Sequence, residues 1–132
     1  MLEIIPIKSA KRVEIMDITP EVQNIVKRSK VREGICLVYS PHTTTAVTIN
    51  ESADPSVKKD ILNSLDRIIP TSNGYSHSEG NSDAHIKSSV IGCERTVIIH
   101  EGVLLLGTWQ GIFFCEFDGP RVRRPHVKIM EG

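Results

Sequence analysis

Two histidines enclose three other polar side chains within a nine-residue stretch of the chain. His77 and His85 flank Glu79, Asn81 and Asp83. Neutral imidazoles and carboxylates are common protein ligands of divalent metal ions, and a site with two or three such ligands leaves room for water or substrate. The spacing is not a familiar zinc signature, so ordinary hydrogen bonding in a loop is the competing interpretation.

A second polar stretch follows an apolar run near residue 40. His42 comes directly after Pro41, which ends the run GICLVYS, so we expect its imidazole at a strand end, where loops carry functional groups over a rigid scaffold. Glu51 and Asp54 follow. Asp54 also has a plain role, because it precedes Pro55 and is suited to cap a helix. A lone strand-end histidine is often just a hydrogen-bonding residue.

The third stretch, GTWQGIFFCEFDGPR, contains the only tryptophan. Trp109 and Gln110 lie between two glycines, which is typical of a pocket wall or an interface, and a position of the Trp in the core is the competing interpretation. Glu116 alternates with apolar residues in a strand pattern, so its carboxylate needs a buried partner. Three arginines that follow are candidates to meet either that carboxylate or a phosphate: Arg121, Arg123 and Arg124.

Three helices and several strands must position these stretches. Capping and breaking residues predict helices from Thr19, with Thr19 as cap, to about Lys30; from Pro55 to a stop at Pro70; and from Ser82 to Ile91, capped by Ser82 or Asp83 and stopped by Gly92. Strands are expected at Glu3–Ile7, Arg12–Ile18, Ile35–Ser40, Ala46–Asn50, Thr96–His100, Val103–Leu106, Ile112–Asp118 and Arg121–Ile129.

The order of these elements predicts an α+β fold. The runs GICLVYS and VLLLG read as strands covered on both faces, and Glu101-Gly102 reads as a hairpin turn. Strands dominate in hairpins, with helices between them, instead of strict strand–helix alternation. The 132 residues therefore predict a single domain, 1–132.

Composition excludes several classes of partner. Sixteen Lys and Arg balance sixteen Asp and Glu, so we expect no nucleic-acid or membrane-surface binding. No apolar run is long enough to span a bilayer, and we expect a cytoplasmic protein. Cys36, Cys93 and Cys115 have apolar neighbours and no C-x-x-C spacing, so they are predicted to be buried free thiols.

The three polar stretches together resemble one protein family. HTTTAVTINESADPSVKKD, HSEGNSDAHIKSSVIG and LLLGTWQGIFFCEFDGPRVR are similar to the signature blocks of the YjbQ-like family, an uncharacterised family also named the secondary thiamine-phosphate synthase enzyme family. The resemblance runs over essentially the whole chain. It implies a compact domain of mainly antiparallel strands in a sandwich-like core, assembled as a homotrimer whose polar site lies close to the subunit contacts.

The resemblance also implies a set of site residues. Those expected to act in catalysis are His42, Glu51, Asp83 and His85. Those expected to bind substrate are Thr43, Asn81, Trp109, Gln110, Glu116 and Arg121, and Asp118 completes the family pattern. The implied ligands of a divalent metal ion, zinc or magnesium, are His42, His77 and His85.

The implied activity joins a pyrimidine methyl diphosphate to a thiazole phosphate, giving thiamine phosphate and pyrophosphate. The substrate would be a small phosphorylated metabolite, with Arg121, Arg123 and Lys87 available for its anionic groups. There is no G-x-x-x-x-G-K phosphate loop. Two alternatives stay open: a metal-dependent phosphate or ester hydrolase, and a non-catalytic trimeric metabolite-binding protein.

Overall fold

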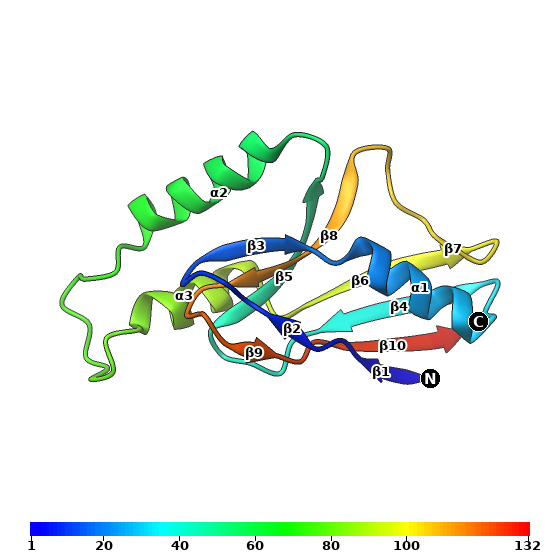
Figure 1. Ribbon diagram of the computed structural model, residues 1–132, viewed down its shortest axis with the longest axis horizontal. Helices are drawn as coiled ribbons and strands as arrows, with labels where there is room; N and C mark the ends of the chain where they lie inside the picture. Colours follow the sequence, from blue (N-terminus) through cyan, green and yellow to red (C-terminus); the bar gives the residue numbers. More distant parts are fainter.

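The computed structural model describes residues 1–132 as ten strands and three helices arranged in layers (Figure 1). The helices are α1 (Thr19–Ser29), α2 (Pro55–Ile68) and α3 (Ser82–Ile91). The strands are β1 (Leu2–Ile4), β2 (Ile7–Lys8), β3 (Glu14–Asp17), β4 (Gly34–Tyr39), β5 (Thr45–Glu51), β6 (Glu94–His100), β7 (Val103–Leu104), β8 (Gln110–Glu116), β9 (Val122–Arg123) and β10 (His126–Glu131).

Two antiparallel sheets face each other across the larger core. The five-stranded sheet has the order β1-β10-β4-β6-β7, and the three-stranded sheet has the order β3-β8-β5. Val22, Ile25 and Val26 of α1 pack with inward side chains of both sheets, among them Val38 and Phe114. A short pair, β2 with β9, completes the pairing. The fold is therefore α+β, as predicted.

A second, smaller core lies on the other face of the three-stranded sheet. Phe113, Cys115 and Phe117 pack there with Ala84 of α3, and α2 contributes Leu62 from its apolar side. No residue of α2 is fully buried. This helix lies over the layer without entering it (Figure 1).

The helix boundaries agree with the sequence, but two of the caps do not. Asp54 caps α2 by accepting a hydrogen bond from the Ser56 amide at 2.9 Å, as predicted. Thr19 is instead the first residue of α1, and its hydroxyl bonds to Asp17. Asn81, not Ser82 or Asp83, stands at the cap position of α3.

The apolar runs expected to be covered on both faces are covered on one. Ile35 and Tyr39 of β4 lie on the outer face of the five-stranded sheet and are exposed, and Val103 and Leu105 of the VLLLG run are exposed too. The reason is that α1 and the second sheet pack only on the inner face. The Glu101-Gly102 hairpin is confirmed, because both residues have positive φ between paired His100 and Val103.

The cysteines differ in their surroundings. Cys36 and Cys115 are buried, and burial raises the pKa of each thiol to about 12. The prediction for Cys93 was wrong: it directly follows Gly92 at the end of α3, and its side chain is exposed.

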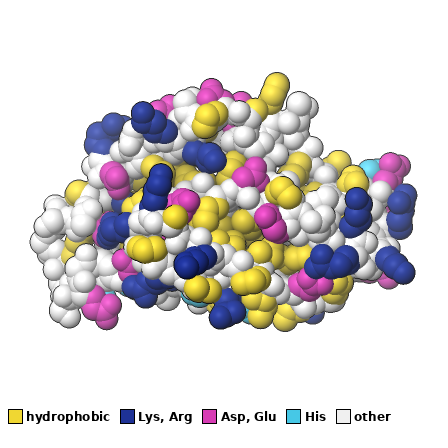
Figure 2. All heavy atoms as spheres, in the orientation of Figure 1, with side chains coloured by type: hydrophobic (Ala, Val, Ile, Leu, Met, Phe, Trp, Pro, Cys, Tyr) yellow, Lys and Arg dark blue, Asp and Glu magenta, His cyan; other side chains and the backbone are white.

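No helix has the length and apolar character needed to cross a membrane. Basic side chains gather at the end of the molecule where α1 ends (Figure 2).

Candidate functional site

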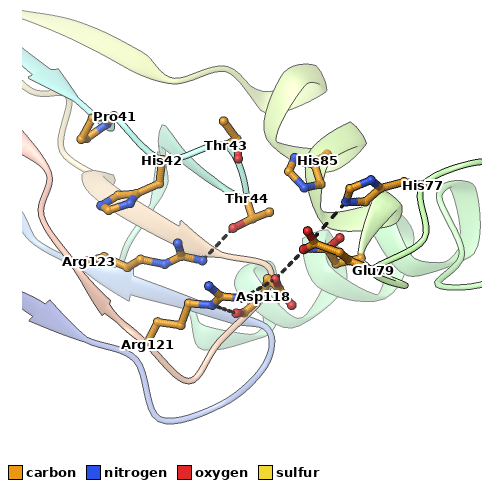
Figure 3. A pocket seen from close by; sticks show the side chains of 11 residues that line it. Pro41, His42, Thr43, Thr44, His77, Glu79, His85, Asp118, Arg121 and Arg123 are labelled. Atoms are coloured by element: carbon orange, nitrogen blue, oxygen red, sulfur yellow. Dashed lines mark hydrogen bonds and ion pairs between the residues drawn. The ribbon is translucent and has the colours of Figure 1, made fainter.

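A polar cavity of about 430 Å³ collects residues from three distant segments of the chain (Figure 3). None of its lining side chains is a large hydrophobic one. The lining residues are Pro41, His42, Thr43, Thr44, His77, Glu79, Asn81, His85, Asp118, Arg121 and Arg123. The first four come from the β4–β5 connection, the next from the α2–α3 loop and α3, and the last three from the turn after β8 and from β9.

His42 is held by the backbone of the opposite wall. Its Nε2 accepts the Arg124 amide at 2.9 Å, which places the ring proton on Nδ1 in the neutral imidazole. Burial and the positive charge of Arg123 lower the pKa of His42. The fold therefore favours a neutral imidazole here, with Nε2 already occupied.

His77 and His85 form the second imidazole group. Their rings meet edge to face with centroids 5.3 Å apart, and His77 Nε2 lies 3.9 Å from Glu79 Oε2. His85 projects from the beginning of α3, whereas the other two come from the loop before it. Thr43 and Thr44 lie between this group and His42 in Figure 3.

These side chains test the expected metal site. No group of three or more His, Cys, Asp or Glu side chains converges to hold an ion. The three histidines divide into the His77–His85 pair and His42, whose Nε2 is bonded to the Arg124 amide. The pair beside Glu79 has the donor types that zinc takes, but the three side chains do not converge on one point.

The turn after β8 brings opposite charges to the cavity floor. Arg121 donates to the Asp118 carboxylate at 3.0 Å and keeps half of its side chain exposed. Asn81 donates to the same carboxylate at 2.9 Å through Nδ2, and its Oδ1 is buried without a hydrogen-bond partner. Asp118 therefore joins the start of α3 to the β8–β9 turn.

A buried ion pair supports this floor from behind. Arg123 binds both oxygens of Glu116, at 2.8 and 2.5 Å, and donates to the Thr44 hydroxyl at 2.8 Å. Ser9 donates to the same carboxylate. Burial raises the pKa of Glu116, but these donors and the Asp118 amide outweigh it, so the pKa lies below its usual range. Glu116 thus has the partner that its sequence position required.

Asp83 and Lys87 lie behind the cavity, not in it. Asp83 is fully buried, where it accepts from Arg12 at 3.1 and 3.3 Å and from Lys87 at 3.4 Å. Burial alone would raise the pKa of Asp83, but Arg12 and Lys87 outweigh it and hold the pKa below its usual range. Lys87 is also fully buried and reaches Asp66 of α2 at 2.6 Å. Neither side chain lines the cavity.

Three other residues of the implied set lie at the far end of the three-stranded sheet. Glu51 pairs with Gln110, whereas Thr45 pairs with Glu116 at the cavity end. Six residues of strand separate these ends by about 20 Å. Trp109 is next to Gln110 and 62% exposed. Within one subunit, the implied residues therefore form two groups.

The structure also adds residues to the site. Thr44 repeats Thr43 in the sequence, but it is buried and accepts a hydrogen bond from Arg123, whereas Thr43 is exposed. Glu79 was noted only as part of the acidic stretch, and Arg123 as one of three equivalent arginines. Arg121 and Arg123 both line the cavity, and of the two only Arg123 is buried, because β9 turns it inward.

Comparisons with known proteins agree over the whole chain. Residues 3–132 match the family described as UPF0047 protein YjbQ-like. The UPF0047 protein YugU of Bacillus subtilis is 50% identical over 131 residues, which are 98% of this chain and 99% of that protein. The UPF0047 protein MJ1081 of Methanocaldococcus jannaschii is 59% identical over 124 residues, 94% of this chain and 90% of that protein.

Solved structures of relatives share the fold. A crystal structure of an uncharacterised YjbQ/UPF0047-family protein from Clostridium acetobutylicum has a TM-score of 0.96 at 48% identity, covering 97% of this chain and 99% of that chain. A YjbQ-like protein of unknown function from Sulfolobus solfataricus also gives 0.96, at 35% identity, covering 100% and 97%. From sequence and fold together, the chain belongs to the YjbQ-like UPF0047 family.

Proposed function

We propose that the chain is a group-transfer enzyme for a small phosphorylated metabolite, with thiamine-phosphate formation as its activity. The observation that supports this proposal is one cavity in which three imidazoles stand beside the half-exposed Arg121. Imidazoles transfer protons near neutral pH, and guanidinium groups bind phosphate oxygens. A reaction that releases diphosphate requires both kinds of group.

The charges of the cavity suggest separate roles for its residues. Arg121 has donor groups beyond its bond to Asp118 and is suited to the leaving diphosphate. His85 and His42 are proposed to handle protons, His42 from the Nδ1 side of its ring. Thr43 and Asn81 are proposed to orient the ligand, whereas Glu116 and Asp83 position the cavity walls.

A divalent cation, zinc or magnesium, is part of the proposal. His77 and His85 would hold it beside Glu79, and it would neutralise charge on a bound diphosphate.

We also propose a cytoplasmic location, because all three cysteines are free thiols.

Alanine variants of the two histidines test the activity. His42→Ala and His85→Ala are expected to lower thiamine-phosphate formation from the pyrimidine diphosphate and the thiazole phosphate by about a hundredfold or more, because a proton-transferring side chain is removed. His100→Ala is the matched control, since His100 is exposed and bonds to Glu33 outside the cavity. Circular dichroism checks that each variant is folded.

The outcomes separate the candidate functions. Normal turnover by both cavity variants contradicts the proposed enzyme. Release of inorganic phosphate from either substrate alone, lost in the same variants, supports the hydrolase. Absence of turnover in the wild type, together with loss of assembly in the variants, supports a binding protein.

A homotrimer is also proposed, and one apolar surface favours it. Ile35, Ile98 and Met130 lie side by side on the outer face of the five-stranded sheet, and Leu105 joins them through its bond to Ile98. These four side chains, the outer patch, are 39 to 56% exposed. Contiguous exposed apolar patches of this kind commonly mark protein–protein contacts. A second copy of the chain is the proposed occupant.

A further inference from the structure

A second cavity, of about 650 Å³, adjoins the polar one. The two share Pro41, His42, Thr43 and His85, so these four residues form the junction between them. The remainder of the second lining comes from the end of β4 and the end of α3. The side chains that matter there are those of Tyr39, Ser88, Ser89 and Cys93.

The two cavities differ in charge. The first is lined by two arginines and two carboxylates, Arg121, Arg123, Glu79 and Asp118. The second has no Asp, Glu, Lys or Arg among its ten lining residues. A charged group placed there would meet no side chain of opposite formal charge. The second cavity therefore suits an uncharged part of a ligand.

The hydroxyl groups of the second cavity are largely used within the protein. Ser88 donates to the Thr45 carbonyl at 2.5 Å, and Ser89 donates to the His85 carbonyl at 3.1 Å. What these walls offer a ligand is the hydroxyls of Tyr39 and Thr43, the thiol of Cys93 and the exposed part of the Tyr39 ring. An aromatic wall with few free donors favours a flat ring that stacks or packs edge to face.

We propose that the second cavity binds a small uncharged heteroaromatic ring of the ligand whose phosphate groups lie in the first cavity. The bond that joins the ring portion to the phosphorylated portion then lies at the junction, beside His42 and His85. This assignment rests on the proposed function, because it names the two halves of its substrate. It explains why His42 and His85 border both cavities.

Cys93 provides a reporter for the second cavity. Its thiol is exposed there, whereas Cys36 and Cys115 are buried and have pKa values raised to about 12, so alkylation by iodoacetamide is expected at Cys93 alone. A phosphate-free aminopyrimidine is expected to slow Cys93 alkylation several-fold at saturation, as measured by mass spectrometry of the Cys93 peptide. Inorganic diphosphate, which the proposed function assigns to the first cavity, is expected to leave the rate unchanged.

Two variants assign the effect to the cavity walls. Tyr39→Ala, at an exposed ring, is expected to abolish protection by the aminopyrimidine, and Arg121→Ala, in the first cavity, is expected to keep it. Equal alkylation rates with and without the ring overturn the proposal, as does a Cys93 that resists alkylation in the free protein. Protection does not depend on turnover, so a protein that binds the ring but makes no product refutes the proposed function and leaves the ring site standing.

Discussion

At the scale of single residues, the structure separates side chains that contact a ligand from side chains that hold the walls. His42, Thr43, His77 and His85 of the HTT and H-x7-H patterns all line one cavity. The patterns did not show that Asp83 is enclosed by cations behind that cavity. A carboxylate looks the same in a sequence whether it meets a buried arginine or a substrate, and only the packing of distant segments decides.

The Glu116–Arg123 pair gives a prediction at this scale. Glu116→Gln keeps the shape of the side chain but leaves the Arg123 charge buried without its counter-ion, and both side chains are almost fully enclosed. We expect a loss of about 3 kcal/mol in the free energy of unfolding, measured with urea at neutral pH. Glu131→Gln, at an exposed position, is the control and is expected to be neutral.

The pH dependence of the same pair has a definite sign. The folded state lowers the pKa of Glu116, so its contribution is complete above the unfolded pKa of about 4.3 and is lost as the pH falls through the lower folded value. The stability gap between wild type and Glu116→Gln should therefore narrow only in acid. A gap that is constant from neutral pH into strong acid would contradict this account.

At the scale of elements, the sequence predicted what local signals determine. The three helices appear where Pro, Gly and capping residues indicated them, and β8 carries Glu116 inward. Whether the second face of a strand is covered could not be predicted in this way, because it depends on which layers pack there. That is why GICLVYS, with Ile35 and Tyr39, and the exposed Cys93 were misjudged.

The attachment of α2 supplies a prediction at this scale. Asp66 of α2 forms an ion pair with the buried Lys87 of α3, with Nζ and Oδ1 2.6 Å apart. Asp66→Asn is expected to weaken the docking of α2 by about 1 kcal/mol, because a charge-assisted bond at a partly exposed site is lost. Hydrogen exchange should then quicken several-fold in α2 and leave β4 and β10 unchanged.

A control on the same helix isolates that bond. Asp60→Asn removes a charge from an exposed position that forms no ion pair in the structure, so α2 exchange should match the wild type. Faster exchange in both variants would mean that overall helix charge, and not the Lys87 contact, holds α2 in place.

At the scale of the whole molecule, one subunit keeps the two groups of implied site residues apart. The cavity lies at one end of β5, and Glu51, Gln110 and Trp109 lie at the other. The sequence motifs do not show this separation, because residues of one motif can lie at opposite ends of the same strand pair. If these residues act together, they do so between subunits of the proposed trimer.

The proposed trimer yields a prediction about mass. The chain has a mass of 14.7 kDa, and light scattering on the wild type is expected to give about three times that value. Ile98→Lys places a charge in the outer patch, where Ile98 is 56% exposed, and is expected to yield monomers. Ile68→Lys on α2, away from the patch, should leave the mass unchanged. A monomeric wild type, or a trimeric Ile98→Lys variant, contradicts the role of the patch.

The pairing of the two chain ends opens a route to rearranging this protein. Leu2 pairs with Lys128 and the Met1 carbonyl accepts from Ile129, so β1 and β10 bring the termini close together on one sheet edge. A short linker can join them, and new ends can be opened in the exposed Thr71–Gly74 segment between α2 and α3. Such a circular permutant would keep every sheet pairing while freeing the loop that carries His77 and Glu79. The fold thereby allows the scaffold and one wall of the cavity to be varied independently.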